Sequence, residues 1–209
     1  MSIRAVIFDY GMVLTGSPDK TAHDAMVGLT GLAVERFEEL YWADRHAYDE
    51  GKLSGLTFWQ QFARDGGLAL SHEQIDELNQ LDAHYWTTQN PAMLSWQQAL
   101  KKNGIRTAIL SNMGDTVLAN IEREFQWIHD FDVQVWSYQL HIAKPDPAIY
   151  LHALDKLGTA PAETLFIDDK LVNVEAARAL GLQAIEFTTV EQLRSDLAAM
   201  NIDPGLPIP

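Results

Sequence analysis

The sequence of 209 residues contains no cysteine, which excludes disulfide bonds and thiol catalysis. Basic residues are also scarce: 15 Lys and Arg stand against 29 Asp and Glu, and the formal net charge is −14 at pH 7. So acidic a chain is a poor match for nucleic acid or for an anionic membrane surface, because phosphate groups bind basic surfaces. It can still bind a small anionic substrate where a lysine or a metal ion neutralises the charge.

Long hydrophobic runs are missing as well. No stretch approaches the roughly 18 consecutive apolar residues that a membrane span requires. The apolar run Ala5–Phe8 is cut short by Asp9, so it does not resemble the core of a signal peptide. We therefore expect a cytoplasmic protein with neither a membrane nor a nucleic-acid partner, and either a monomer or a homodimer.

Short apolar runs bounded by turn residues alternate with helical patterns along most of the chain. Such runs are typical of buried parallel strands, and glycines just past the helical patterns are typical left-handed stops. The alternation predicts an α/β fold, a doubly wound, Rossmann-like parallel sheet with ligands beyond the carboxyl ends of its strands. The expected strands are Ala5–Asp9, Arg106–Asn112, Asp132–Ser137, Thr164–Asp169 and Gln183–Phe187, and the expected helices are Pro91–Asn103, Thr116–Phe125, Pro147–Leu157 and Val172–Leu180.

A helical stretch interrupts this alternation between Gly16 and Asn90. Its apolar residues recur at helical spacing, and glycines stop each pattern. The stretch is too short and too polar for a large second domain, so we expect a small helical cap over the loop after the first strand. The expected division is a core of residues 1–15 and 91–200, a cap of residues 16–90, and a loose tail of residues 201–209.

Residues suited to phosphate or metal chemistry stand at the ends of several expected strands. Asp9, Ser111 and the pair Asp168 and Asp169 all fall at carboxyl ends, which can meet in one site. Asp9 can attack phosphorus and form an aspartyl-phosphate. Adjacent carboxylates repel unless a cation lies near them, and such hard oxygen ligands fit Mg²⁺. Lys144, in a proline-bounded loop, suits an ammonium held next to developing negative charge.

The chain contains, in this order, the segments VIFDYGMVLT, ILSN, AKPDPAIY and LFIDDKLVNVEAARALG. Together they resemble the haloacid dehalogenase superfamily of aspartate-nucleophile hydrolases, in a subfamily IA-like branch whose helical C1 cap follows the first motif. The resemblance covers essentially the whole chain. It implies an enzyme, a Mg²⁺-dependent phosphatase of small, sugar phosphate-like monoesters that acts through an aspartyl-phosphate on Asp9.

The resemblance also implies roles for individual residues. Asp9 is the nucleophile, Lys144 offsets the phosphoryl charge, and Ser111 with Asn112 binds the phosphoryl oxygens. The residues implied to hold or support Mg²⁺ are Asp9, Asp169, the backbone carbonyl of Gly11, Asp168 as a ligand or an outer partner, and Asn173, which orients the acidic loop.

Gly11 departs from the commonest phosphatase pattern, in which a second Asp at this position protonates the leaving alcohol and then activates water. Loss of a positioned acid–base group typically costs about 10²–10⁴-fold in rate. Relatives with D-x-G-x-V here resemble sugar-phosphate phosphatases of the α-glucose-1-phosphate phosphatase-like branch, so activity is still expected. The sequence does not decide among the candidate substitutes Tyr10, Thr15, His141, Arg45, His46, Glu50 and Lys52.

The cap loop is also expected to select the substrate. Arg45 and Lys52 are candidates to hold an anion, and Tyr41, Trp42 and Tyr48 are candidates to stack on the substrate or hydrogen-bond to it.

Two other functions stay open. A 2-haloacid dehalogenase would use Asp9 to attack carbon without a metal, and halide leaves without protonation. A catalytically weakened phospho-ligand-binding member is the second, and Gly11 is the feature in its favour. The pair Asp168 and Asp169 favours phosphate chemistry, and a binding module has no need of the nucleophile.

Overall fold

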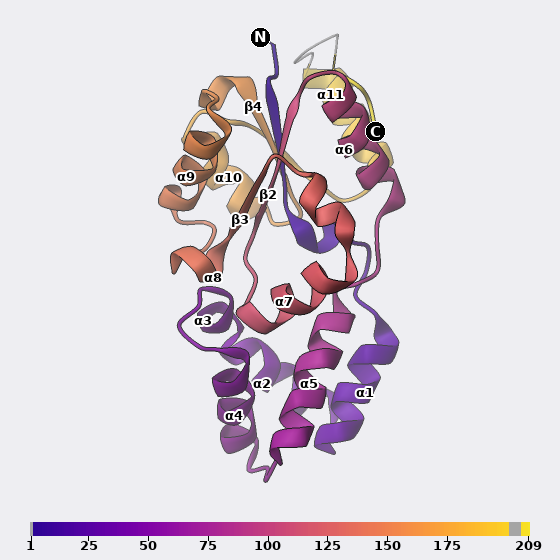
Figure 1. Ribbon diagram of the computed structural model, residues 1–209, viewed down its shortest axis with the longest axis vertical. Helices are drawn as coiled ribbons and strands as arrows, with labels where there is room; N and C mark the ends of the chain where they lie inside the picture. Colours follow the sequence, from indigo (N-terminus) through magenta and orange to yellow (C-terminus); the bar gives the residue numbers. More distant parts are fainter. Residues whose placement is uncertain (1, 201–205) are drawn as a thin grey trace.

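The computed structural model describes residues 2–200 and 206–209 (Figure 1). In this part of the chain, a five-stranded parallel sheet has the strand order β3-β2-β1-β4-β5. This confirms the predicted doubly wound α/β fold, and each predicted strand is present to within one residue at either end. The strands are β1 (Ala5–Phe8), β2 (Arg106–Ser111), β3 (Val133–Trp136), β4 (Thr164–Asp168) and β5 (Gln183–Glu186).

Helices cover both faces of the sheet, which explains why its strands are continuous apolar runs. Along β1, Val6 and Phe8 belong to one core cluster, whereas Ala5 and Ile7 belong to the other. The helices are α6 (Pro91–Lys102) and α11 (Val190–Met200) against the first cluster, and α9 (Pro147–Leu157) and α10 (Leu171–Ala179) against the second (Figure 1).

Left-handed glycines follow the core helices, as predicted. Gly104, Gly158 and Gly181 come after α6, α9 and α10 with φ angles of 76°, 62° and 89°, a region that residues with a Cβ rarely adopt. None of the described helices is long and apolar enough to cross a membrane. Outside residues 10–85, the other elements of the described chain are α7 (Asp115–Glu124), α8 (Ser137–Leu140) and the short helices η2 (Gln126–Asp130) and η3 (Pro161–Glu163).

Residues 20–85 form a helical insertion, which lies at the end of the molecule away from the N- and C-termini (Figure 1). The two segments that connect it to the sheet are paired, because Thr15 and Gln89 form an antiparallel bridge. The helical character of the stretch is confirmed, while the division into core and cap at residues 15/16 and 90/91 stays a prediction. The helices are α1 (Lys20–Thr30), α2 (Val34–Ala43), α3 (Arg45–Asp49), α4 (Gly55–Gly66) and α5 (His72–Tyr85).

Within the predicted tail of residues 201–209, Leu206 and Pro207 contact the core beside α6. Residues 201–205 of that prediction lie outside the described residues. Leu206 is buried in the first core cluster, and Trp96 Nε1 donates a hydrogen bond to the Pro207 carbonyl oxygen at 2.6 Å. Burial of apolar surface therefore holds this segment, although its glycine and prolines are typical of a free tail.

Candidate active site

The carboxyl ends of β1, β2 and β4 meet at one edge of the sheet. β1 lies between the other two, and Phe8 pairs in register with both neighbours. The next residue, Asp9, is held beside them because its NH donates to the Ile167 carbonyl oxygen at 2.9 Å. Ser111 ends β2 and Asp168 ends β4, so the sheet brings these side chains to a common edge, as predicted.

The turn after Asp9, η1 (Tyr10–Leu14), does not require a glycine at residue 11. Gly11 has an extended backbone with φ −63° and ψ 135°, whereas Met12 takes the left-handed φ of 61°. A Cβ on Gly11 would meet the Trp86 ring at 3.6 Å, an ordinary van der Waals contact. The missing acid at Gly11 is therefore a chemical departure that the fold does not impose.

Lys144 lies between two carboxylates. Its Nζ is 2.9 Å from Asp9 Oδ1 and 2.6 Å from Asp168 Oδ2, and the residue is buried. Burial alone would lower the pKa of Lys144, but Asp168 and Asp9 more than offset this and raise it above its usual value. Asn112 braces the lysine: its Nδ2 donates to the Lys144 carbonyl at 2.9 Å, and the Lys144 NH donates to its Oδ1 at 2.8 Å. The Asn112 amide is thus engaged with the backbone.

Asp9, Asp168 and Asp169 each bring one carboxylate oxygen within 4.8 Å of the others. Besides the lysine, Asp168 has two further donors: Asn173 Nδ2 lies 2.9 Å from its Oδ1, and the Lys170 NH lies 2.8 Å from the same oxygen. Asn173 therefore contacts Asp168, one member of the acidic pair. Asp168 does not line the pocket described below, whereas Asp9 and Asp169 do, so these two are better placed to bind a cation directly.

The charge of this cluster fits a divalent cation. Burial raises the pKa of Asp9 to about 7, with repulsion from Asp168 and Asp169 adding to the shift and Lys144 opposing it. Burial and Asp168 also raise the pKa of Asp169. Lys144 and Lys170, which both oppose the shift of Asp169, do not balance three acids. A cation with a preference for oxygen ligands would favour the ionised forms of these acids.

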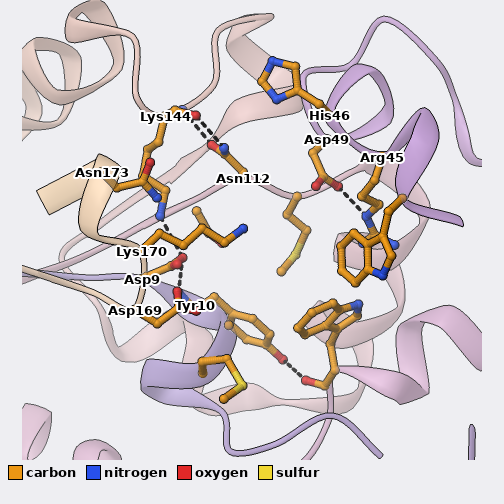
Figure 2. Close-up of a pocket in the computed structure, with 16 residues that line it drawn as sticks. Asp9, Tyr10, Arg45, His46, Asp49, Asn112, Lys144, Asp169, Lys170 and Asn173 are labelled. Carbon is orange, nitrogen blue, oxygen red and sulfur yellow. Dashed lines mark hydrogen bonds and ion pairs between the residues drawn. The ribbon is translucent and has the colours of Figure 1, made fainter. Parts of the chain in front are cut away.

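These residues form one side of a pocket of about 390 Å³ (Figure 2). The helical insertion and its connection supply the other side with Trp42, Arg45, His46, Asp49 and Trp86. A pocket of this volume suits a small ligand. Of the residues named for the site from the sequence, those that line the pocket are Asp9, Tyr10, Gly11, Trp42, Arg45, His46, Ser111, Asn112, Lys144, Asp169 and Asn173.

The two cations of the insertion that were expected to hold an anion are already paired. Arg45 lies at the pocket, but its Nε is 3.0 Å from Asp49 Oδ1 and its Nη1 is 2.9 Å from Asp82 Oδ1. Lys52 lies away from the pocket lining and its Nζ is 2.6 Å from Glu50 Oε2. Arg45 is therefore the centre of a buried ion-pair cluster. Lys52 is itself exposed and pairs with the largely buried Glu50.

Of the three aromatic residues expected to contact the substrate, one lines the pocket and two do not. Trp42 lines the pocket, whereas Tyr41 and Tyr48 are buried behind it. The Tyr41 hydroxyl donates to Asp82 Oδ1 at 2.6 Å, and the Tyr48 hydroxyl accepts from the Val117 NH at 3.3 Å. Both tyrosines thus support the pocket wall.

Most candidates for the missing acid are poorly placed. The Tyr10 hydroxyl donates to the Trp86 carbonyl at 3.0 Å, and burial raises the pKa of Tyr10 well above its usual value. His46 lies at the rim of the pocket with 69% of its side chain exposed (Figure 2). Four others do not line the pocket: Thr15, Glu50, Lys52 and His141.

One pocket carboxylate was missed by sequence reasoning. Asp49 ends α3 four residues after Arg45, and this helical i, i+4 spacing of opposite charges was the signal available. Its carboxylate points into the pocket from the insertion (Figure 2). The spacing indicates an ion pair but does not tell which side of the helix faces a substrate.

Comparisons with known proteins identify a family for this chain. A family model described as a haloacid dehalogenase-like hydrolase matches residues 3–181. The chain is 30% identical over 190 residues to Phosphatase MT3486 of Mycobacterium tuberculosis, which covers 88% of this chain and 87% of that protein. It is 29% identical over 201 residues to (S)-2-haloacid dehalogenase 1 of a Pseudomonas species, which covers 91% and 86%.

The fold also matches solved structures. A haloacid dehalogenase family enzyme from Bacteroides thetaiotaomicron, solved in complex with magnesium and inorganic phosphate, superposes with a TM-score of 0.75 at 20% identity. The match covers 90% of this chain and 95% of that chain. At this identity the likeness establishes the arrangement of the elements.

Proposed function

The chain belongs to the haloacid dehalogenase-like hydrolase family, and on this premise we propose that it is a Mg²⁺-dependent hydrolase of small phosphate monoesters. The observation that carries the proposal is the placement of Lys144 between Asp9 and Asp168, with Asp169 beside them. Such a site can bind a dianionic phosphoryl group only through cations, and it offers a carboxylate for attack. The phosphatase among the relatives is consistent with this chemistry.

The chain's own residues have separable tasks in this reaction. Asp9 attacks phosphorus and forms an aspartyl-phosphate, which water then hydrolyses. Lys144 offsets the charge that develops on the phosphoryl oxygens, and the Ser111 hydroxyl orients one of them. Magnesium, held by Asp9, Asp169 and the Gly11 carbonyl, would supply Lewis-acid stabilisation of the phosphoryl group. Asp168 would act as the outer partner that fixes Lys144.

The dehalogenase alternative is less compatible with the site. A 2-haloacid carries a carboxylate, and without a metal it would meet three acids that share one buried lysine. Like charges at short range disfavour that complex. A binding-only role is disfavoured because the nucleophile and its lysine are both retained.

We further propose sugar phosphates as the first substrates to examine, in a cytoplasmic enzyme that is a monomer or a homodimer. The test is phosphate release from p-nitrophenyl phosphate and a panel of sugar phosphates, with Mg²⁺ or with EDTA. We expect turnover that needs Mg²⁺ and disappears in Asp9→Asn. Absence of turnover on every ester, or chloride release from a 2-chloroacid without metal, would reject the proposal.

A further inference from the structure

Hydrolysis of an alkyl phosphate needs a proton donor that the sheet edge does not offer. An alkoxide is a strong base and leaves poorly unless it is protonated as it departs. Gly11 has no side chain, and the acids beside it are committed to Lys144 or placed to bind a cation. A carboxylic acid free to donate the proton must therefore lie on the other side of the pocket.

We propose that Asp49 is the general acid, and later the general base, of the phosphatase reaction. The inference rests on the proposed function and deepens it, since it gives a catalytic task to the helical insertion.

The position of Asp49 is the first support. It lines the same pocket as Asp9, and its carboxylate enters that pocket from the insertion, where a leaving group pointing away from the nucleophile would lie (Figure 2). Its side chain is 15% exposed, so it is shielded from bulk water and still reachable from the cavity. Among the residues that line the pocket, it is the carboxylic acid outside the cation cluster.

The contacts of Asp49 are the second support. Arg45 contacts Asp49 through a single donor, since its Nε donates to Asp49 Oδ1 while its Nη1 donates to Asp82. Asp82 also accepts from Tyr41 and is completely enclosed. One guanidinium thus serves two acids, and Asp49 is the one that faces the substrate cavity.

The electrostatics are compatible with a proton carrier. Burial raises the pKa of Asp49 to about 6, Arg45 opposes the shift, Asp82 adds to it, and Lys170 from the sheet side opposes it. These are the charged groups that face Asp49 from α3, from α5 and from the loop before α10. A group that titrates near the working pH is suited to donate a proton and then accept one.

The sheet domain holds α3 in place. The Ser137 hydroxyl donates to the Asp49 carbonyl oxygen. Gly51 lies so close to the start of α8 that a Cβ there would stand 2.5 Å from the Tyr138 carbonyl oxygen. On the neighbouring loop, a Cβ on Gly114 would stand 2.2 Å from the Tyr48 ring. These close approaches fix the backbone that carries the Asp49 side chain over the pocket.

The reaction then balances with the chain's own groups. In the first half, an Asp9 oxygen bonds to phosphorus, the bond from phosphorus to the leaving oxygen breaks, and protonated Asp49 gives its proton to that oxygen. In the second half, water gives a proton to the Asp49 carboxylate, its oxygen bonds to phosphorus, and the Asp9–phosphorus bond breaks. Asp49 ends protonated and Asp9 ends ionised, ready for the next cycle.

The test compares two leaving groups on Asp49→Asn. The amide keeps an oxygen for Arg45 but carries no transferable proton. With a sugar phosphate, kcat/KM should fall by about 10²–10⁴-fold, whereas with p-nitrophenyl phosphate, whose leaving group needs no acid, it should fall by less than about tenfold. That ester should also show a burst of nitrophenol, because the base that activates water is lost. Asp44→Asn, at the other end of α3 and away from the pocket lining, is the matched control.

The outcomes separate this inference from the proposed function. If wild type hydrolyses no phosphate ester, the proposed function fails. If wild type is active and Asp49→Asn loses both esters equally or neither, only the role of Asp49 is rejected. Should the variant fold poorly, a pH series on wild type decides. The kcat/KM for a sugar phosphate divided by the kcat/KM for p-nitrophenyl phosphate should fall as pH rises through about 6, the pKa of Asp49. A constant ratio would overturn the inference.

A second variant tests independently whether a missing proton donor causes the loss of activity. Since residue 11 has room for a Cβ, Gly11→Asp in the Asp49→Asn background can place an acid at the sheet edge. Partial recovery of sugar phosphate turnover would support a missing proton donor as the defect. A folded double variant with no recovery, together with an equal loss on both esters, would contradict it.

Discussion

Lys144 is the buried cation that partly neutralises the carboxylates of the active site. It is buried, and its ammonium lies within 3 Å of carboxylate oxygens of Asp9, just past β1, and of Asp168, at the end of β4. A buried charge of this kind is expensive to remove, because its partners are left unbalanced.

We therefore expect Lys144→Met to lower phosphatase turnover by at least about 10²-fold at saturating Mg²⁺. The variant should also unfold at a lower temperature than wild type, since Asp9 and Asp168 then repel without a cation between them. Steady-state kinetics and thermal unfolding check both. Lys102→Met, an exposed lysine on α6, is the control. Unchanged turnover in Lys144→Met would contradict the role of Lys144.

At the scale of elements, α3 and the loop after it connect the insertion to the sheet side. Gly51 has a φ of 76° and approaches the Tyr138 carbonyl, so it serves both the turn and the close contact. Gly31 has a similar φ of 68°, but nothing lies within 4 Å of the place its Cβ would take. Alanine at either residue would strain the backbone, but only alanine at residue 51 would also push against α8. Comparing the two variants therefore separates the effect of strain from the effect on the position of α3.

Gly51→Ala should displace α3 and lower turnover by about tenfold or more, because a shift of about 1 Å at a catalytic group can cost up to about 10² in rate. Gly31→Ala should lose about 1 kcal/mol of stability from the same left-handed strain and keep its turnover. Equal turnover in both variants, measured on a sugar phosphate, would show that the approach of Gly51 to α8 does not position the active site.

The elements themselves were largely predictable. Fully buried parallel strands are unbroken apolar runs and glycines punctuate the helices, so strand ends such as Asp9 and Ser111 were located from local pattern. The partners of Arg45 were not, because Asp82 is 37 residues away and only packing of α5 brings it near. Asp49 was missed because its spacing from Arg45 indicates an ion pair but not which side of α3 faces the pocket.

At the scale of the whole molecule, the sheet edge and the helical insertion line one pocket from opposite sides. The sheet edge supplies the nucleophile, the lysine and the carboxylates for a cation, while the insertion supplies the opposite wall (Figure 2). The net charge of −14 makes the cost of three clustered acids larger, since the surrounding protein is also negative.

The metal-free protein should lose stability as pH rises from about 4 to about 7. The folded-state pKa values of Asp9, about 7, and Asp49, about 6, lie above their unfolded values. The folded state therefore binds more protons in this window, and the free energy of unfolding falls as these protons leave. Thermal unfolding in EDTA across this range measures the effect.

Added Mg²⁺ should reverse part of that loss at pH 7, because a ligand that binds only the folded state stabilises it. Asp169→Asn should weaken the response to Mg²⁺. A metal-free protein whose unfolding temperature rises steadily over this pH window, or does not respond to Mg²⁺, would contradict the assignment of the cation cluster.

The most direct single measurement is the mass of the peptide that contains Asp9 after an acid quench of the reaction with p-nitrophenyl phosphate and Mg²⁺. Attack by Asp9 predicts one added phosphoryl group on this peptide, more of it in Asp49→Asn than in wild type, and none in Asp9→Asn. Phosphate release without a phosphoryl group on Asp9, or a labelled peptide in Asp9→Asn, would show that Asp9 is not the nucleophile.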